Sequence, residues 1–366
     1  MITYRGLELN ATATTIGFLG AIYALLPVLL AVFFGRAADK FGEKQLLIFG
    51  ATGILISSLF LRGASSLAEL AVFTAMAGVA HLAVMVGGQT MVSRKSPSEY
   101  YDKYFGYYTF SASFGQMIGP LLGGLVAGSA GTLPKSTTNA FTIAAVLAII
   151  GVIPLILTKS EKINQSNTYQ QKTSKVKVSS LLTNKGISSA IFTSLIISSA
   201  SDILVVFLPL FGQEKNFTPA VVGLLLSLRA GMAMISRFFL GNLSDRFTAR
   251  NVMISSGLLS AVSCGLLFFG NTVILIAFII AVAGFALGIG QPLTMAWVSR
   301  SSKIDERAMA ISLRLTGNRL GQFGLPLIAG VTASTLGVGS VFLVLSGMLG
   351  VSTLVSVRNF QGSERD

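Results

Sequence analysis

The chain has 366 residues, of which 52% are hydrophobic and 11% are charged, whereas a typical soluble domain carries about 25% charged residues. This composition excludes an ordinary water-soluble globule. Lys and Arg number 27 against 14 Asp and Glu, but the bases do not gather on one polar domain, so we expect no nucleic-acid partner. A single cysteine, Cys264, excludes a disulfide framework and a cysteine-based metal site.

Eleven mostly apolar runs follow one another along the chain. A helix of roughly 20 residues crosses a ~30 Å hydrocarbon core, because each residue adds about 1.5 Å. We therefore predict an all-α polytopic membrane protein. Its spans are expected at 13–34, 46–62, 69–91, 104–128, 139–158, 186–210, 218–241, 251–269, 271–298, 308–336 and 338–357.

One long polar segment, KSEKINQSNTYQQKTSKVKVSSLLTNK, separates the fifth run from the sixth. Because it is rich in Lys, Ser, Thr, Asn and Gln and shows no apolar period, we predict a solvated linker at 159–185. The linker divides the chain into an N-terminal bundle of about five spans, residues 1–158, and a C-terminal bundle of about six, residues 186–366.

The basic residues outside the spans fall mainly in alternate loops. The opposite loops hold only Arg5, Arg62, Lys135 and Lys215. Since short loops rich in Lys and Arg stay in the cytoplasm, we expect the linker and the C-terminus to be cytoplasmic in a plasma or inner membrane. An odd number of spans then puts the N-terminus outside.

Two charged turns repeat the same pattern after long apolar runs. The first reads GRAADKFGEK from Gly35, and the second reads GNLSDRFTAR from Gly241. In each, an Asp follows the Gly by four residues and precedes a base and a Phe. Two halves built on one plan, with a substrate site between them, are the simplest interpretation.

These turns resemble the signature of the major facilitator superfamily, G-x-x-x-D-[RK]-x-G-[RK]-[RK], which follows that family's second helix and recurs more weakly after its eighth. Glu43 stands where a base is usual. The resemblance implies a transporter of two pseudo-symmetric bundles, with Asp39 as a gate latch on the cytoplasmic side; a simple turn-forming Asp is the alternative. The matching residues are Gly35, Asp39, Lys40, Gly42 and Lys44, then Gly241, Asp245 and Arg246.

A second motif lies in the fourth run, GYYTFSASFGQMIGPLLGG. It resembles the antiporter motif of drug exporters in the same superfamily, which implies efflux in exchange for a cation. Glycines at these intervals let helix backbones approach closely, and this is also common in membrane helices without that function. The matching residues are Gly106, Gly115, Gly119, Pro120, Gly123 and Gly124.

The first turn comes one helix earlier than the family pattern requires. The segment GLELNATATTIGFLGAIYALL resembles the outer loop and the start of the family's second helix, so the family's first helix is not recognisable. Three alternatives follow: a start upstream of Met1, a shortened transporter, or a non-transporting membrane protein.

Asp202 is the only acid well inside a predicted span. It lies about 8 residues, or ~12 Å, from the outer end of its helix, and Arg229 lies about 11 residues, or ~16 Å, from the outer end of the next. Ionisable residues at membrane depth are costly and usually have a functional role. We therefore hypothesise an Asp202–Arg229 pair in coupling or substrate binding. A pair that only holds two helices together is the alternative.

The run ISLRLTGNRLGQFGLPLIAG carries the other polar residues at membrane depth. At 100° per residue, Arg314, Asn318 and Gln322 fall within an arc of about 80°, with Arg319 about 140° from Arg314. This face favours a substrate with a carboxylate. Alternatively, Arg314 snorkels to the cytoplasmic surface, or one Arg meets Asp39.

Three further features bear on function. His81, the only histidine, could carry protons, or could be hydrogen-bonded to a neighbouring helix. The arginine that proton-coupled exporters of the family carry in this helix is missing. Trp297, at the end of a span, is expected to be an interfacial anchor.

The sequence therefore predicts a secondary transporter, acting as a monomer without a cofactor, that exports a small organic solute by exchange with H⁺. Proton-coupled uptake of an organic anion is the alternative. We expect no enzyme, because no nucleophile with a base, metal spacing or phosphate loop is visible in the sequence.

Overall fold

The computed structural model describes residues 1–95, 101–157, 178–303 and 306–360, and these residues are mainly helical. The short helices are α1 (Ile2–Glu8) and α7 (Val178–Thr183). The long helices are α2 (Ala13–Phe41), α3 (Glu43–Gly63), α4 (Leu67–Lys95), α5 (Tyr101–Ala127), α6 (Thr137–Leu157), α8 (Lys185–Glu214), α9 (Pro219–Phe247), α10 (Ala249–Leu267), α11 (Val273–Ser301), α12 (Arg307–Leu336) and α13 (Val338–Asn359).

Each predicted span coincides with one long helix, which confirms the all-α polytopic fold class. By length and apolar composition, 10 of these helices can cross a membrane. The helix that fails this criterion is α12, although it has 30 residues. Its polar residues at membrane depth lower its hydropathy, and it packs against α2 and α8 among the spanning helices.

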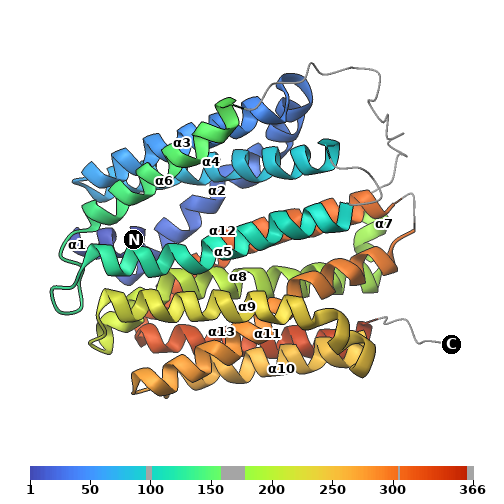
Figure 1. Ribbon diagram of the computed structural model, residues 1–366. Coiled ribbons are helices and arrows are strands. Elements are labelled where there is room, and N and C mark those ends of the chain that lie inside the picture. The colour runs from blue at the N-terminus through green and yellow to red at the C-terminus, as the bar shows by residue number, and fades with distance from the viewer. Residues whose placement is uncertain (96–100, 158–177, 304–305, 361–366) are drawn as a thin grey trace.

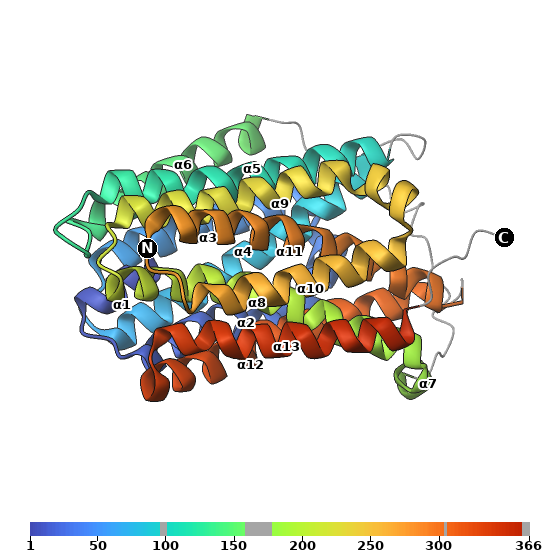
Figure 2. The same ribbon diagram turned by 90° about the horizontal axis from the view of Figure 1, so that it is seen from below.

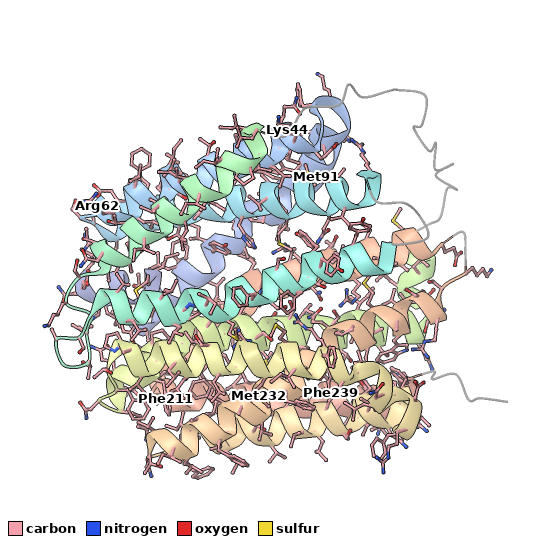
Figure 3. The ribbon with its side chains drawn as sticks, in the orientation of Figure 1. Lys44, Arg62, Met91, Phe211, Met232 and Phe239 are labelled. Carbon is pink, nitrogen blue, oxygen red and sulfur yellow. The ribbon has the colours of Figure 1, made fainter. Side chains whose placement is uncertain are left out.

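The long helices run side by side from one end of the molecule to the other (Figures 1 and 2). The N-terminus lies with α1 at one end and α13 finishes at the opposite end, near α7. We call these the α1 end and the α7 end. Lys44 and Arg62 lie at opposite ends of α3 (Figure 3), as expected for charges that flank an apolar span.

Polar caps and positive-φ residues set several helix boundaries. Thr12, Thr218 and Thr272 each accept a hydrogen bond from a backbone N–H three residues later, which satisfies a donor that the helix itself leaves free. Gly42, with φ 91°, ends α2 and begins α3. A residue with a Cβ is strained at that φ, and glycine is not.

We keep the halves proposed from the sequence as names: α1 to α6 form the N-terminal half and α8 to α13 the C-terminal half. The halves touch where α2 meets α12 and where α5 meets α9. Gly17 of α2 lies against Pro326 and Gly330 of α12. Gly124 of α5 lies against α9, and α5 packs more extensively on α9 than on α4 or α6.

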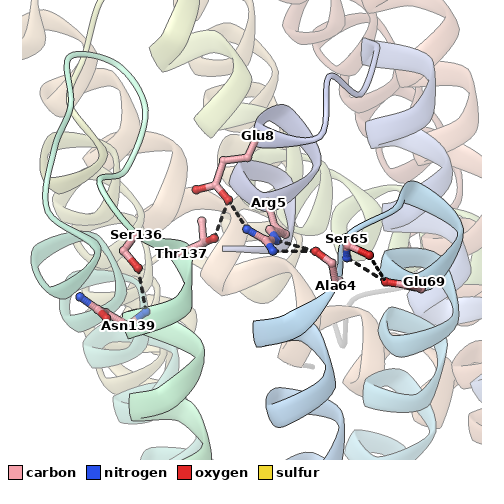
Figure 4. A network of polar contacts seen from close by, with 8 residues as sticks. All are labelled: Arg5, Glu8, Ala64, Ser65, Glu69, Ser136, Thr137 and Asn139. Carbon is pink, nitrogen blue, oxygen red and sulfur yellow. Dashed lines mark hydrogen bonds and ion pairs between the residues drawn. The ribbon is translucent and has the colours of Figure 1, made fainter.

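A polar network at the α1 end ties the short helix α1 to its neighbours (Figure 4). Arg5 donates from Nε and Nη2 to the carbonyl oxygen of Ala64, at 3.1 and 2.6 Å, and from Nη1 to Glu8 Oε2 at 2.8 Å. Thr137 Oγ1 donates to the same Glu8 oxygen at 2.7 Å. The network therefore joins α1 to the end of α3 and the start of α6.

Helix α1 also contacts the C-terminal half. Thr3 Oγ1 donates to the carbonyl oxygen of Val206 in α8, at 3.1 Å. Thr3 and Tyr4 are buried. Together with the α2–α12 and α5–α9 contacts, α1 thus holds the two halves together at the α1 end.

Candidate functional site

A cluster of polar side chains at membrane depth brings the two halves together through their side chains. Arg319 of α12 donates from Nη1 to Gln322 Oε1 at 3.0 Å and from Nη2 to the sulfur of Met85 in α4 at 3.5 Å. Gln322 Nε2 donates to Ser198 Oγ of α8 at 3.1 Å. Arg319 thus reaches from the C-terminal half to the N-terminal half.

Asp202 of α8 belongs to this cluster. Among charged groups Arg229 acts on it most strongly, followed by Arg319, and Gln322 lies within reach of its carboxylate. The ion pairs shorter than 4.0 Å in the described part of the chain join other residues. Asp202 and Arg229 are therefore electrostatic neighbours without a direct salt bridge.

The N-terminal half contributes an aromatic pair to the same region. The rings of Tyr23 in α2 and His81 in α4 lie 6.0 Å apart, centroid to centroid. Both side chains lie within the field of Arg319, and Tyr23 also lies within that of Asp202. The structure thus brings His81 together with the candidate residues of the C-terminal half.

Arg314 lies deep inside the protein, and the expectation that it snorkels to the cytoplasmic surface is wrong. Its side chain is 3% exposed. Nη2 donates to the carbonyl oxygen and Oε1 of Gln291, at 2.9 and 2.7 Å, and to Thr294 Oγ1 at 3.1 Å. Because all three acceptors belong to α11, Arg314 is a brace between α11 and α12. Asn318, one turn further on, is buried, and its Oδ1 has no partner among the described residues.

Sequence reasoning gave no role to Arg237 of α9, which links the two halves. Its Nη1 donates to Ser113 Oγ of α5 at 3.0 Å, and its Nε donates to the carbonyl oxygen of Gly288 at 3.4 Å. Its position well inside an apolar run was the available signal, because an arginine there requires partners.

The two charged turns share local geometry as well as sequence. Lys40 lies over the ring of Phe41, 5.2 Å from its centroid, and Arg246 lies over the ring of Phe247 at 5.5 Å. Each turn then ends on a positive-φ residue that begins the next helix, Gly42 in the first and Thr248 in the second. The repetition therefore extends to the way each turn reverses the chain.

Glu43, the residue of the first turn that departs from the family signature, has a partner in the structure. Glu43, where a base is usual, accepts a hydrogen bond from Arg94 of α4 at 3.3 Å, and Arg94 also donates to the carbonyl oxygen of Ala38 at 3.3 Å. Lys44 Nζ donates to the carbonyl oxygen of Ile156 in α6 at 3.4 Å. The turn is thus tied to two other helices of its own half.

The latch contact predicted for Asp39 remains a prediction, because its side chain lies outside those that the structure describes. Asp39 itself lies near the end of α2, and Asp245 lies near the end of α9. Gly35 and Gly241 have room for a side chain, since a Cβ built on either meets no atom within 4 Å.

The glycines of the α5 motif do not act as one surface. A Cβ on Gly124 would lie 2.6 Å from the carbonyl oxygen of Pro219, and a Cβ on Gly223 would lie 2.5 Å from that of Pro120. Gly123 lies beside Met1, whereas Gly115 and Gly119 meet nothing within 4 Å. The surroundings of Gly106 lie outside the described part. Among the motif residues whose surroundings the structure describes, Pro120 and Gly124 make the close contact with α9, near the α1 end.

Trp297 is not an interfacial anchor. It is 0% exposed and its ring lies 4.8 Å from that of Phe360, centroid to centroid. In the described part, no group of three His, Cys, Asp or Glu residues is placed to hold a metal.

Comparisons with known proteins agree with this architecture. A sequence profile described as Major Facilitator Superfamily matches residues 1–218 and 190–365. The class H tetracycline resistance protein of Pasteurella multocida is 27% identical over 311 residues, which cover 82% of this chain and 74% of that protein. Quinolone resistance protein NorA of Staphylococcus aureus is 25% identical over 333 residues, 88% of this chain and 82% of NorA.

Solved structures share the fold. A crystal structure of nucleoside transporter NupG superposes with a TM-score of 0.79 at 16% identity, over 98% of this chain and 93% of that one. A crystal structure of a D-xylose-proton symporter gives a TM-score of 0.78 at 15% identity, over 96% of this chain and 89% of that one.

Proposed function

The chain belongs to the Major Facilitator Superfamily, and we propose that it exports a small organic solute in exchange for protons. It is a multi-pass membrane transporter and not an enzyme. In the proposal it works as a monomer in the plasma or inner membrane, with the linker and C-terminus in the cytoplasm. Its halves, residues 1–158 and 186–366, rock against each other so that the site between them opens to one side at a time.

The polar cluster between the halves is the observation that carries the proposal. Arg319 contacts Met85 across the junction, and Asp202 lies in the field of Arg229 and Arg319. A carboxylate at membrane depth is expensive to keep charged, so Asp202 is suited to take up and release a proton. A group that changes charge beside a cross-half contact can couple protonation to rocking.

Export is favoured by the relatives and by α5. Two relatives are resistance proteins by name, and a transporter can confer resistance to an antibiotic by moving it out of the cell. The antiporter-type residues Pro120 and Gly124 lie in the tight contact between α5 and α9. A motif that holds the halves together at one end fits a protein that must open and close that end.

Everted membrane vesicles that contain the full chain test the proposal. With an acid interior, we expect the vesicles to accumulate tetracycline or ciprofloxacin and to lose this accumulation when the pH gradient is collapsed. Asp202→Asn should abolish the gradient dependence. Glu214→Gln is the matched control, because Glu214 is an acid of the same helix that lies at its α1 end, where it accepts a hydrogen bond from the Val338 N–H. Gradient-driven accumulation by Asp202→Asn would contradict the assignment.

Proton-coupled uptake of an organic anion is a second candidate, and one observation favours it. Within the described helices, Asp202 is the acid at membrane depth, whereas four arginines lie well inside the spans: Arg229, Arg237, Arg314 and Arg319. Such an excess of positive charge attracts anions. Uptake of a labelled organic anion by right-side-out vesicles, driven by external acid, would favour this candidate over export.

A further inference from the structure

Arg229 of α9 is a buried guanidinium without a partner. It is 9% exposed, and it makes no hydrogen bond and no ion pair within 4.0 Å to any residue that the structure describes. The other three arginines at membrane depth all have hydrogen-bond partners. A buried charge without a direct hydrogen bond or ion pair is costly, so packing alone does not explain Arg229.

The unpaired nitrogens of Arg229 are accessible at their tips. Its Nε atom is fully buried and has no hydrogen-bond partner in the described part, whereas its two terminal nitrogens are not fully buried. Since they bond to nothing in the described part, they must retain some accessible surface. The end of the guanidinium, which is the part that binds a carboxylate through two parallel hydrogen bonds, is therefore not completely closed off by protein atoms.

Asp202 has the complementary character. Its side chain is partly exposed, and Arg229 is the charged group with the largest electrostatic effect on its carboxylate. Two opposite charges at low dielectric attract strongly, yet these two remain more than 4.0 Å apart. The protein thus holds two opposite charges on neighbouring helices without a direct ion pair between them.

We propose that Arg229 and Asp202 form a two-charge subsite for a zwitterionic organic solute, with the carboxylate on Arg229 and the ammonium group on Asp202. This inference rests on the proposed function and names its substrate class. When the ammonium group arrives, the proton on Asp202 leaves to water on the open side, and an ion pair replaces the O–H bond. Solute and proton then compete for one carboxylate, as exchange requires.

The fixed charges also explain why one solute should satisfy both groups. An ammonium compound without a carboxylate leaves Arg229 unpaired, and a carboxylate without an ammonium group repels the ionised form of Asp202. A zwitterion compensates both charges at once. Arginine suits the first role because its planar fork matches a carboxylate, which lysine does not.

Binding to the purified full chain tests the subsite separately from transport. We would compare ciprofloxacin, which carries both groups, with its methyl ester and its N-acetyl derivative by ligand-induced shifts in apparent Tm. The wild type should bind ciprofloxacin at least tenfold more tightly than either derivative, which corresponds to about 1.4 kcal/mol. Arg229→Gln should remove the preference over the ester, and Asp202→Asn the preference over the N-acetyl compound.

Arg237→Gln is the matched control, because Arg237 lies on the same helix but already has protein partners. It should leave the order of the three compounds unchanged. Equal binding of the three compounds, no stabilisation by ciprofloxacin, or an equal loss for all three in Arg229→Gln would overturn the subsite. Selective binding without proton-driven transport would contradict the proposed function and leave the subsite standing.

Discussion

Replacement of Gly124 by alanine should separate α5 from α9. The added methyl group would lie 2.6 Å from the carbonyl oxygen of Pro219 and 3.3 Å from Cα of Gly223. The obstacle is backbone on a facing helix, which cannot move aside as a flexible side chain can. The two helices must therefore move apart where the halves meet.

The size of the effect follows from two opposed contributions. Overpacking of a tight contact costs typically about 1–3 kcal/mol, whereas alanine in place of glycine stabilises a helix interior by roughly 0.5–1 kcal/mol. We expect a net loss of about 1–2 kcal/mol for Gly124→Ala. At Gly119 of the same helix no atom lies within 4 Å of a built Cβ, so Gly119→Ala keeps only the favourable contribution.

The assay is the apparent Tm of the detergent-solubilised protein, with the initial rate of solute transport as a second readout. Gly124→Ala should unfold at a lower temperature than the wild type, and Gly119→Ala at the same or a higher temperature. If Gly124→Ala proved as stable and as active as Gly119→Ala, the close contact between α5 and α9 would be refuted.

Three more predictions concern the turns and the α1 end. Arg5→Gln loses the charged hydrogen bonds from Arg5 to Glu8 within α1 and to the Ala64 carbonyl at the end of α3, so thermal unfolding should show a loss of about 1.5–3 kcal/mol; an unchanged Tm would contradict the network. Gly42→Ala places a Cβ at φ 91° and ψ 155°, where a residue with a Cβ is strained, and should cost about 1–3 kcal/mol, whereas the helical control Gly35→Ala should not lower Tm. Glu43→Lys sets a cation against Arg94, and a loss of up to about 1 kcal/mol is expected, reversed by the charge-swapped double variant.

The fold could be predicted from the sequence because its signal is local. Apolar runs of spanning length are set by bilayer thickness, so the eleven predicted runs coincide with eleven long helices. Several predicted spans are shorter than the helices that contain them. Helix α9 continues to Phe247, beyond its predicted end at 241, because polar residues can extend a helix past the apolar run.

The sequence predicted neighbours in the site only where the depth of two residues in the membrane is enough to bring them together. The fixed rise of a helix put Asp202 and Arg229 at one level, and the structure makes them electrostatic neighbours. The angular position of a side chain around its helix does not determine which neighbouring helix it contacts. Arg314 donates a hydrogen bond to α11, whereas Gln322, on the same predicted face, donates one to α8. The contact of Arg319 with Met85 depends on how the halves dock, which no local pattern encodes.

Reversible cross-linking of α2 to α12 tests most directly whether the halves must separate during transport. Thr14 lies beside Gly330 at the α1 end, so Thr14→Cys and Val331→Cys, with the native buried Cys264 replaced by alanine, offer two thiols near that contact. A short thiol cross-linker should stop proton-driven transport, and reduction should restore it, while each single-cysteine variant stays active. Full-rate transport by the cross-linked protein would contradict alternating access between these two halves.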